Sequence, residues 1–265
     1  MSVIYTPKGP AREYSPLALN LYLQCTHGCK YCYAPSAMQR AKENYFCDAN
    51  MPVPRKNVIM QLRRELKREA PKKQVLLSFI GDVYCETADR NATTREALEL
   101  LNEHCVPVAV LTKGGQRCLK DLDVFKRFGK HIQIGATLTF LDEAKSAEWE
   151  SGAASPKERL ETLNVLHKEG VQTFVSFEPV IEPQESLKLI EKTIADGSVD
   201  IYKVGKINHY QGLDKGVDWS WFLREALKMI RATGKRVYVK HDLRVAAHDV
   251  KLYGNEVLAD DFAVT

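Results

Sequence analysis

The fold of this chain is decided by the stretch Gln24-Cys25-Thr26-His27-Gly28-Cys29-Lys30-Tyr31-Cys32-Tyr33-Ala34-Pro35, in which three cysteines follow the spacing C-x3-C-x2-C. Thiolates hold iron–sulfur clusters, and a cubane [4Fe–4S] cluster normally takes four of them. A compact loop that offers three leaves one iron without a protein ligand. Such an iron can bind a small molecule, as the open position on a catalytic zinc does. The spacing therefore predicts a [4Fe–4S] cluster with one open iron.

Two other uses of these thiols stay open. A structural zinc site needs four ligands, usually from two separated pairs, and no second C-x2-C completes such a site, although His27 could serve as the fourth ligand. Disulfides are the other use, but seven cysteines in 265 residues is a low density and an odd number. We also expect no secretory signal sequence at the start. We interpret Cys47, Cys105 and Cys118 as structural.

The motif resembles the C-x3-C-x-aromatic-C signature of the radical S-adenosylmethionine (SAM) superfamily. The resemblance implies that Cys25, Cys29 and Cys32 hold the cluster and that the open iron binds SAM through its amino and carboxylate groups. It also implies reductive cleavage of SAM to a 5′-deoxyadenosyl radical. Tyr31 would then lie near the adenine, whereas without the resemblance it is a buried aromatic under the cluster loop.

The composition is that of an ordinary globular protein. The chain is 45% apolar and 27% charged, with a formal net charge of +4. That charge permits a nucleic-acid partner without arguing for one. The sequence contains no apolar stretch of about 18 residues, so we expect no membrane span. Free thiols and an oxygen-sensitive cluster fit a reducing cytoplasm.

Short apolar runs alternate with amphipathic helical segments along the chain. Seven runs are predicted as strands: Ala18–Tyr22, Gln74–Ile80, Pro107–Leu111, Ile132–Thr139, Val171–Phe177, Asp200–Val204 and Arg236–Val239. Most are continuous rather than alternating, as buried parallel strands are. Helix starts are predicted at the capping box Thr93…Glu96, at Ser155 before Pro156, and at Asp218.

Repeated strand–helix units imply a parallel sheet with right-handed crossovers. We therefore expect an α/β fold, a partial (β/α)6-type barrel that is an incomplete TIM-like barrel with a C-terminal extension. The chain is read as a single domain over residues 1–265. Its lead-in would cover about 1–20, the barrel core about 17–204 and the extension about 205–265. In such folds ligands bind at the carboxyl ends of the strands, where the cysteine loop follows the first strand.

Polar residues at the other strand ends are candidate SAM ligands. Gly81 allows close approach and Asp82 could accept from the SAM ammonium, although Gly-Asp is also common in ordinary turns. Lys113 could reach a carboxylate or a phosphate, or be solvated. Two further pairs of candidates each share one side of a strand by the period of two: Thr137 with Thr139, which could contact SAM or simply be threonines of the rim, and Ser176 with Glu178.

The order of motifs is similar to that of the spore photoproduct lyase and DNA repair photolyase-like branch. The matching residues are the cysteine motif with Tyr33, then Gly81-Asp82, Thr112-Lys113, Glu150, Ser155-Pro156, Arg159 and Pro179, whereas the chain after Val199 resembles uncharacterised, partly phage-borne relatives. The resemblance implies a nucleic-acid or nucleotide substrate, a radical relay at Tyr33 and a cofactor contact at Lys113. Where the lyase has its hydrogen-donor cysteine, three positions before the aspartate, this chain has Phe79. Cys85, three positions after Asp82, is a candidate donor from a different position. This departure puts spore photoproduct repair itself in doubt.

Three hypotheses follow. The first is a radical SAM enzyme, of lyase or oxidoreductase type, that acts on a nucleic acid or nucleotide and takes its electron from a donor such as flavodoxin or ferredoxin. The second keeps the radical chemistry but has a peptide or small metabolite as substrate. The third is a non-catalytic iron–sulfur redox or sensing protein. Barrel rims change specificity through their loops, so the sequence leaves the substrate open.

Overall fold

The computed structural model describes every residue except 1, 39–53, 87–91, 209 and 211, so Cys47 lies outside the described residues. Its centre is one sheet of eight strands in sequence order, β1 to β8. The strands are β1 (Ile4–Tyr5), β2 (Leu17–Leu19), β3 (Val75–Leu77), β4 (Val108–Thr112), β5 (Ile132–Thr137), β6 (Gln172–Val180), β7 (Ile201–Lys206) and β8 (Arg236–Val239). β1 is antiparallel to β2, and all other neighbours are parallel.

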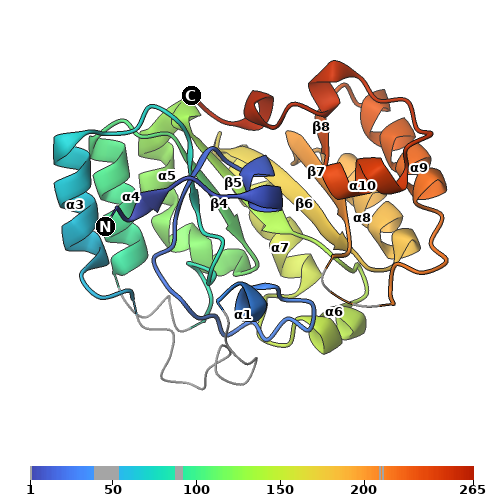
Figure 1. Ribbon diagram of the computed structural model, residues 1–265, viewed down its shortest axis with the longest axis horizontal. Helices are drawn as coiled ribbons and strands as arrows, with labels where there is room; N and C mark the ends of the chain where they lie inside the picture. Colours follow the sequence, from blue (N-terminus) through green and yellow to red (C-terminus); the bar gives the residue numbers. More distant parts are fainter. Residues whose placement is uncertain (1, 39–53, 87–91, 209, 211) are drawn as a thin grey trace.

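Helices connect the strands and lie around the sheet (Figure 1). They are α1 (Ala34–Ala37), α3 (Val58–Arg68), α4 (Thr93–Glu103), α5 (Leu122–Phe128), α6 (Glu143–Trp149), α7 (Pro156–Lys168), α8 (Pro183–Asp196), α9 (Trp219–Ala232) and α10 (His241–Ala246). Figure 1 shows α3, α4 and α5 at one end of the molecule and α8, α9 and α10 at the other. None of the described helices is long and apolar enough to cross a membrane.

The sheet confirms the predicted α/β class and the incomplete barrel. Within the described residues β1 pairs only with β2 and β8 only with β7, so the sheet does not close on itself. The parallel part continues to β8, beyond the expected end of the core at residue 204. Several predicted strands run too far at their carboxyl ends, because residues there leave the sheet to form the loops that line the site.

Two of the three predicted helix starts have the expected cap. The Ser155 side chain accepts a hydrogen bond from the backbone N–H of Glu158, and Asp218 caps α9 in the same way. The predicted capping box at Thr93 is wrong. Thr93 is already the first residue of α4, so the cap position falls on Ala92. An alanine side chain has no oxygen that could accept a hydrogen bond from the first turn, and none is made.

The amino end of the sheet is filled by polar side chains and by residues near position 264. Gln133 Nε2 donates to Gln74 Oε1 at 2.6 Å and to the carbonyl of Phe262 at 2.9 Å. The backbone N–H of Val264 donates to the same Gln74 oxygen at 2.9 Å. These bonds attach the segment around Phe262–Val264 to the amino end of the sheet, opposite the carboxyl ends of the strands.

Candidate active site

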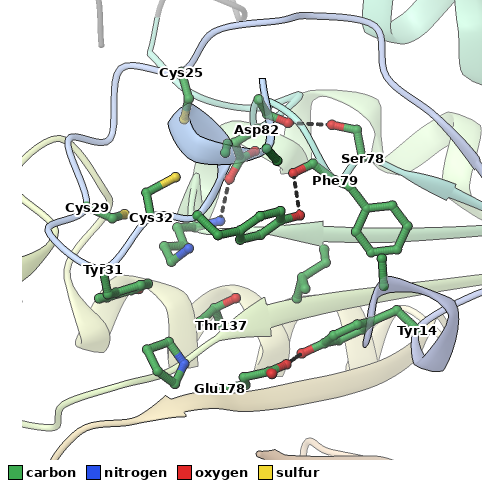
Figure 2. A pocket seen from close by; sticks show the side chains of 18 of the residues that line it. Tyr14, Cys25, Cys29, Tyr31, Cys32, Ser78, Phe79, Asp82, Thr137 and Glu178 are labelled. Carbon is green, nitrogen blue, oxygen red and sulfur yellow. Dashed lines mark hydrogen bonds between the residues drawn. The ribbon is translucent and has the colours of Figure 1, made fainter. Parts of the chain in front are cut away.

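A cavity of about 450 Å³ opens at the carboxyl ends of the parallel strands, where the sequence predicted the site. It brings together residues from the cysteine loop, from the carboxyl ends of β3 to β8 and from the segment before β2, and Figure 2 shows part of this lining. Ten of the predicted site residues line it: Cys25, Cys29, Tyr31, Cys32, Tyr33, Gly81, Asp82, Lys113, Thr137 and Glu178. Three do not: Cys85, Thr139 and Ser176.

The cysteine loop is held by backbone hydrogen bonds to the connection between α6 and α7. The N–H of Lys30 donates to the carbonyl of Trp149 at 2.9 Å, and the N–H of Gly152 donates to the carbonyl of His27 at 2.9 Å. A Cβ on Gly152 would lie 2.1 Å from the carbonyl oxygen of Thr26, so only glycine allows this approach. The loop therefore depends on a segment more than 100 residues away in sequence.

His27 joins the cysteine loop to two neighbouring loops. Its Nδ1 lies 3.0 Å from the carbonyl oxygen of Gly152 and its Nε2 lies 2.8 Å from Oδ2 of Asp82. The imidazole is buried, and these two contacts hold the loop between Cys25 and Cys29.

Asp82 accepts four hydrogen bonds from within the protein. Oδ1 accepts from the backbone N–H of Tyr84 and the hydroxyl of Thr112, while Oδ2 accepts from His27 and the N–H of Lys113, all at 2.7–2.8 Å. Burial raises the pKa of this carboxyl, but the charge of His27 and the hydrogen bonds outweigh it and hold the pKa well below its usual range. Both oxygens are occupied, which argues against the predicted contact with the SAM ammonium. Asp82 organises the loops instead.

Gly81 permits a close approach between two loops of the protein, whereas its predicted contact with SAM stays a prediction. Its φ is +73°, and a Cβ there would lie 2.5 Å from the carbonyl oxygen of Gln24, just before the first cysteine. The glycine therefore lets the loop after β3 press against the start of the cysteine loop.

Tyr31 is fixed by a buried ion pair. Its hydroxyl donates to Oε1 of Glu150, and Arg159 Nη2 lies 2.7 Å from Oε2 of the same carboxylate. Arg159 also donates through Nη1 to the carbonyl of Thr137 at 2.9 Å. Lys113 Nζ lies 5.5 Å from the centre of the Tyr31 ring. The buried Glu150–Arg159 pair thus holds Tyr31 and the end of β5 at Thr137, and Lys113 lies over the ring of Tyr31 on the same wall.

The charge of Lys113 is set by opposing effects. Burial lowers the pKa of its ammonium, but the nearby Cys29 and Glu150 raise it, and the net pKa lies above the ordinary lysine value. The ammonium therefore stays charged at the rim of the cavity. Burial raises the pKa of the Cys29 thiol to about 12, so a bound metal would be needed to keep that sulfur ionised at neutral pH.

Thr139 and Ser176 do not reach the cavity, which corrects their prediction as cofactor ligands. β5 ends at Thr137, so the alternation of a strand no longer applies two residues later, and Thr139 is fully buried. Ser176 does lie on β6, but its hydroxyl is 2.5 Å from the Tyr14 hydroxyl, which covers it. Ser176 supports a cavity residue rather than lining the cavity.

Cys85 is also away from the cavity, which corrects its prediction as a hydrogen donor to substrate. Its side chain is fully buried behind the cysteine loop, where it is hydrogen-bonded to Cys25. A donor thiol must approach the substrate radical, and Cys85 contacts a cluster-ligand position instead. Cys118 is buried as expected of a structural cysteine, whereas Cys105 is exposed in the turn after α4.

Tyr14 and Lys240 are cavity residues that the sequence analysis missed. Lys240 directly follows β8, so the rule about strand ends could have found it. Tyr14 lies in the irregular segment before β2, and no sequence signal points to it. Other residues that line the cavity without having been predicted as site residues include Lys8, Ser78, Phe79, Pro179 and Asn208.

Lys203 lies next to Tyr14, and its lowered pKa makes the free energy of unfolding depend on pH. Burial, reinforced by the charges of Lys240 and Arg236, lowers the pKa of Lys203 to about 7. An unfolded lysine keeps its proton to about pH 10.4, so above pH 7 the unfolded state binds more protons and the free energy of unfolding rises with pH. We expect Lys203→Met to remove up to about 1.4 kcal/mol of this rise per pH unit between about pH 7 and pH 10.

The measurement is urea unfolding at several pH values within that window. Lys206→Met is the control, because Lys206 lies on the same strand with its ammonium 3.4 Å from a surface carboxylate. Equal pH slopes for Lys203→Met and the unmodified chain would contradict the prediction.

The donor set at the cavity fits an iron–sulfur cluster with one open iron. Cys25, Cys29 and Cys32 form no disulfide, and all three thiol side chains line the same cavity. The three cysteines share one cavity wall on a loop held from both sides.

Comparison with known proteins identifies the family. The family model of the radical SAM superfamily matches residues 19–196, which include the three cysteines and the ends of β2 to β6. The chain belongs to the radical SAM superfamily. Proteins of this superfamily use a [4Fe–4S] cluster and SAM, so the cofactors predicted from the cysteine spacing are confirmed.

Curated relatives of this radical SAM chain are themselves uncharacterised. Protein MJ0683 of Methanocaldococcus jannaschii is 26% identical over 174 residues, which are 66% of this chain and 62% of the relative. Rv2578c of Mycobacterium tuberculosis is 26% identical over 78% of this chain and 62% of its own length. ORF301 of Acidianus two-tailed virus is 24% identical over 74% of this chain and 68% of its own length. The chain thus spans less than two thirds of the first two relatives.

Solved structures of radical SAM proteins share the fold. Spore photoproduct lyase with bound AdoMet and dinucleoside spore photoproduct aligns with a TM-score of 0.59 and 13% identity, over 86% of this chain and 63% of the lyase. SuiB of Streptococcus suis bound to its precursor peptide SuiA aligns with a TM-score of 0.61 and 11% identity, over 89% and 52%. Methylornithine synthase aligns with a TM-score of 0.55 and 12% identity, over 88% and 68%.

Proposed function

We propose that this radical SAM protein is an enzyme that forms a 5′-deoxyadenosyl radical and acts with it on a nucleic acid or nucleotide. The observation that carries the proposal is one cavity that joins the three-cysteine loop to a wall of aromatic rings and lysines. A non-catalytic redox or sensing protein would have no use for such a substrate-sized cavity beside an open iron.

The residues of this chain have distinct tasks in that chemistry. When bound, the cluster and SAM supply the radical by one-electron reduction of SAM. Cys25, Cys29 and Cys32 would hold the cluster. Tyr31 and Lys113 would contact SAM from the wall fixed by the Glu150–Arg159 pair. Because these side chains are already fixed, they hold SAM in one position, and no entropy has to be lost to order them during the reaction.

The lining of the cavity favours a nucleotide. Among the residues that the structure describes, four aromatic side chains line it (Tyr14, Tyr31, Tyr33 and Phe79), and so do three lysines (Lys8, Lys113 and Lys240). Bases stack on aromatic side chains, and lysines neutralise phosphates. The spore photoproduct lyase aligned above contains a dinucleoside, which supports the same class of substrate by analogy of fold.

Tyr33 stays a candidate radical relay in this proposal. Its hydroxyl donates to the carbonyl of Phe79 at 2.8 Å, at the position where the lyase has its donor cysteine. Phenylalanine has no transferable thiol hydrogen, so the reaction type, lyase or oxidoreductase, is expected to differ from that of the lyase at this step.

The test uses anaerobically reconstituted enzyme, SAM, dithionite and a mixed-sequence oligonucleotide deuterated on its carbons. We expect deuterium in the 5′-deoxyadenosine that forms. We also expect binding that weakens as the salt concentration rises, because a lysine that neutralises a phosphate releases a counterion. Formation of 5′-deoxyadenosine without deuterium and without oligonucleotide binding would favour a peptide or small-metabolite substrate.

A further inference from the structure

Glu178 presents a carboxylate with one oxygen fixed and the other open to the cavity. Oε2 accepts the hydroxyl of Tyr14 at 2.6 Å and the ammonium of Lys240 at 2.6 Å. Among the described residues, Oε1 accepts no hydrogen bond. The side chain is 18% exposed, and it lines the cavity. One acceptor atom is therefore directed at whatever fills this part of the cavity.

The groups that hold Glu178 are themselves rigid. Tyr14 is fixed by the 2.5 Å contact of its hydroxyl with Ser176 and by two lysine side chains over its ring, with Nζ of Lys240 at 4.4 Å and Nζ of Lys203 at 5.0 Å. The charge of Lys240 offsets that of the carboxylate, which lowers the cost of keeping both out of water. A site whose geometry is set before the ligand arrives loses little entropy on binding.

A glycine on the neighbouring strand, β7, leaves room for the side chains of Glu178 and Lys240. A Cβ on Gly205 of β7 would lie 3.0 Å from Cδ of Lys240 and 3.1 Å from Cδ of Glu178. Any other residue would push the two side chains from their positions. The carboxylate, the ammonium and the glycine come from the ends of three adjacent strands, β6, β7 and β8.

Glu178 lies on the side of the cavity away from the cysteine loop. Figure 2 shows the three cysteines together at one side of the drawn pocket, and Glu178 with Tyr14 at the other. Thr137 lies between them in that view. The contacts of SAM are expected near the cysteines, because the open iron binds its amino and carboxylate groups. The Glu178 wall is left for the substrate.

We propose that Glu178 binds the substrate by accepting a hydrogen bond from an N–H of a nucleobase, and that it is not a SAM ligand. This inference rests on the proposed nucleotide substrate and names its anchor. An ionised carboxylate accepts only, so the ligand must bring the hydrogen. Nucleobases carry N–H groups in the plane of a flat ring. Phe79, which packs edge to face with Tyr14 at 6.3 Å between ring centroids, lines the cavity and gives such a ring an aromatic surface on this side.

The test measures equilibrium binding to the reconstituted holoenzyme in the presence of SAM. The probes are the four deoxynucleoside 5′-monophosphates and their analogues in which the donor N–H of each base carries methyl groups instead. For the tightest-binding nucleotide we expect methylation to weaken binding by about 10-fold or more, the size of one hydrogen bond to a charged group. In Glu178→Ala the methylation penalty should fall below about 2-fold, as a coupled pair requires.

Glu182→Gln is the matched control, because this carboxylate is exposed and pairs with Lys145 outside the cavity. It should keep the full methylation penalty. Glu178→Gln, which keeps an acceptor and the side-chain size, should give a penalty between those of Glu178→Ala and the unmodified chain.

Three results would overturn the inference: a methylation penalty that persists in Glu178→Ala, no measurable binding of any of the four nucleotides, or a loss of SAM affinity in Glu178→Ala as large as the loss of nucleotide affinity. The last result would place Glu178 on the cofactor, and a peptide substrate would leave all four nucleotides unbound. The proposed radical chemistry fails separately, if the unmodified holoenzyme forms no 5′-deoxyadenosine from SAM.

Discussion

Replacing Cys29 by alanine is expected to abolish cleavage of SAM. The rate of 5′-deoxyadenosine formation should fall by more than about 100-fold, since even loss of an outer partner of a metal ligand costs 10- to 100-fold. Cys29 is one of three thiols available on the loop, and it is buried at the cavity wall. The neighbouring Cys85 cannot replace it, because that thiol contacts Cys25 instead.

The measurement is chromatography of 5′-deoxyadenosine after anaerobic reconstitution, together with the iron and sulfide content of the protein. Cys105→Gly is the matched control, because Cys105 is exposed and has a φ of +53°, which glycine adopts freely. It removes a thiol without removing a ligand, so it should leave iron content and turnover unchanged. If Cys29→Ala formed 5′-deoxyadenosine at the rate of the unmodified protein, Cys29 would not be a ligand of the cluster.

The second large effect is expected from Glu150→Gln. This change leaves the guanidinium of Arg159 as an uncompensated charge in the protein interior, where both side chains are almost fully buried. Breaking a buried ion pair in this way costs about 3–5 kcal/mol of the free energy of unfolding. Urea unfolding of the two proteins in the same cofactor state gives the difference.

The control is Glu169→Gln, which breaks the ion pair of Glu169 with Lys126 on the surface. Exposed pairs contribute about 0–1 kcal/mol, so this variant should unfold almost as the unmodified chain does. If both variants lose the same small amount, the Glu150–Arg159 pair is not what holds the Tyr31 wall. The amount of SAM bound by Glu150→Gln gives a further readout, because Tyr31 loses the charged acceptor of its hydroxyl.

The place of the cysteine loop at the cavity was predictable because its signal is local. Three cysteines in one short loop need no tertiary information, and the rule that ligands bind at the carboxyl ends of parallel strands then places Gly81, Lys113 and Thr137 around them. The same rule failed at Thr139, because it needs to know where β5 ends. Strand ends depend on the sheet that forms and not on the apolar run alone.

Contacts between distant segments could not be predicted. The carboxylate of Asp82 takes its hydrogen bonds from His27, Tyr84, Thr112 and Lys113, and nothing in a Gly-Asp pair indicates that its oxygens are already occupied. Tyr14 reaches Glu178 from a segment with no regular strand or long helix. Period and motif describe neighbours in sequence, whereas these roles are decided by neighbours in space.

The shared carboxylate of Asp82 has a consequence for engineering this rim. Loops following β2, β3 and β4 all donate to it, through His27, Tyr84 and the Thr112–Lys113 pair. These three loops are therefore not interchangeable modules. A cysteine loop grafted from another member of the superfamily would leave a carboxylate oxygen without one of its donors unless it also brought a hydrogen-bonding group at the place of His27. Redesign of this end of the barrel has to transplant all three loops together.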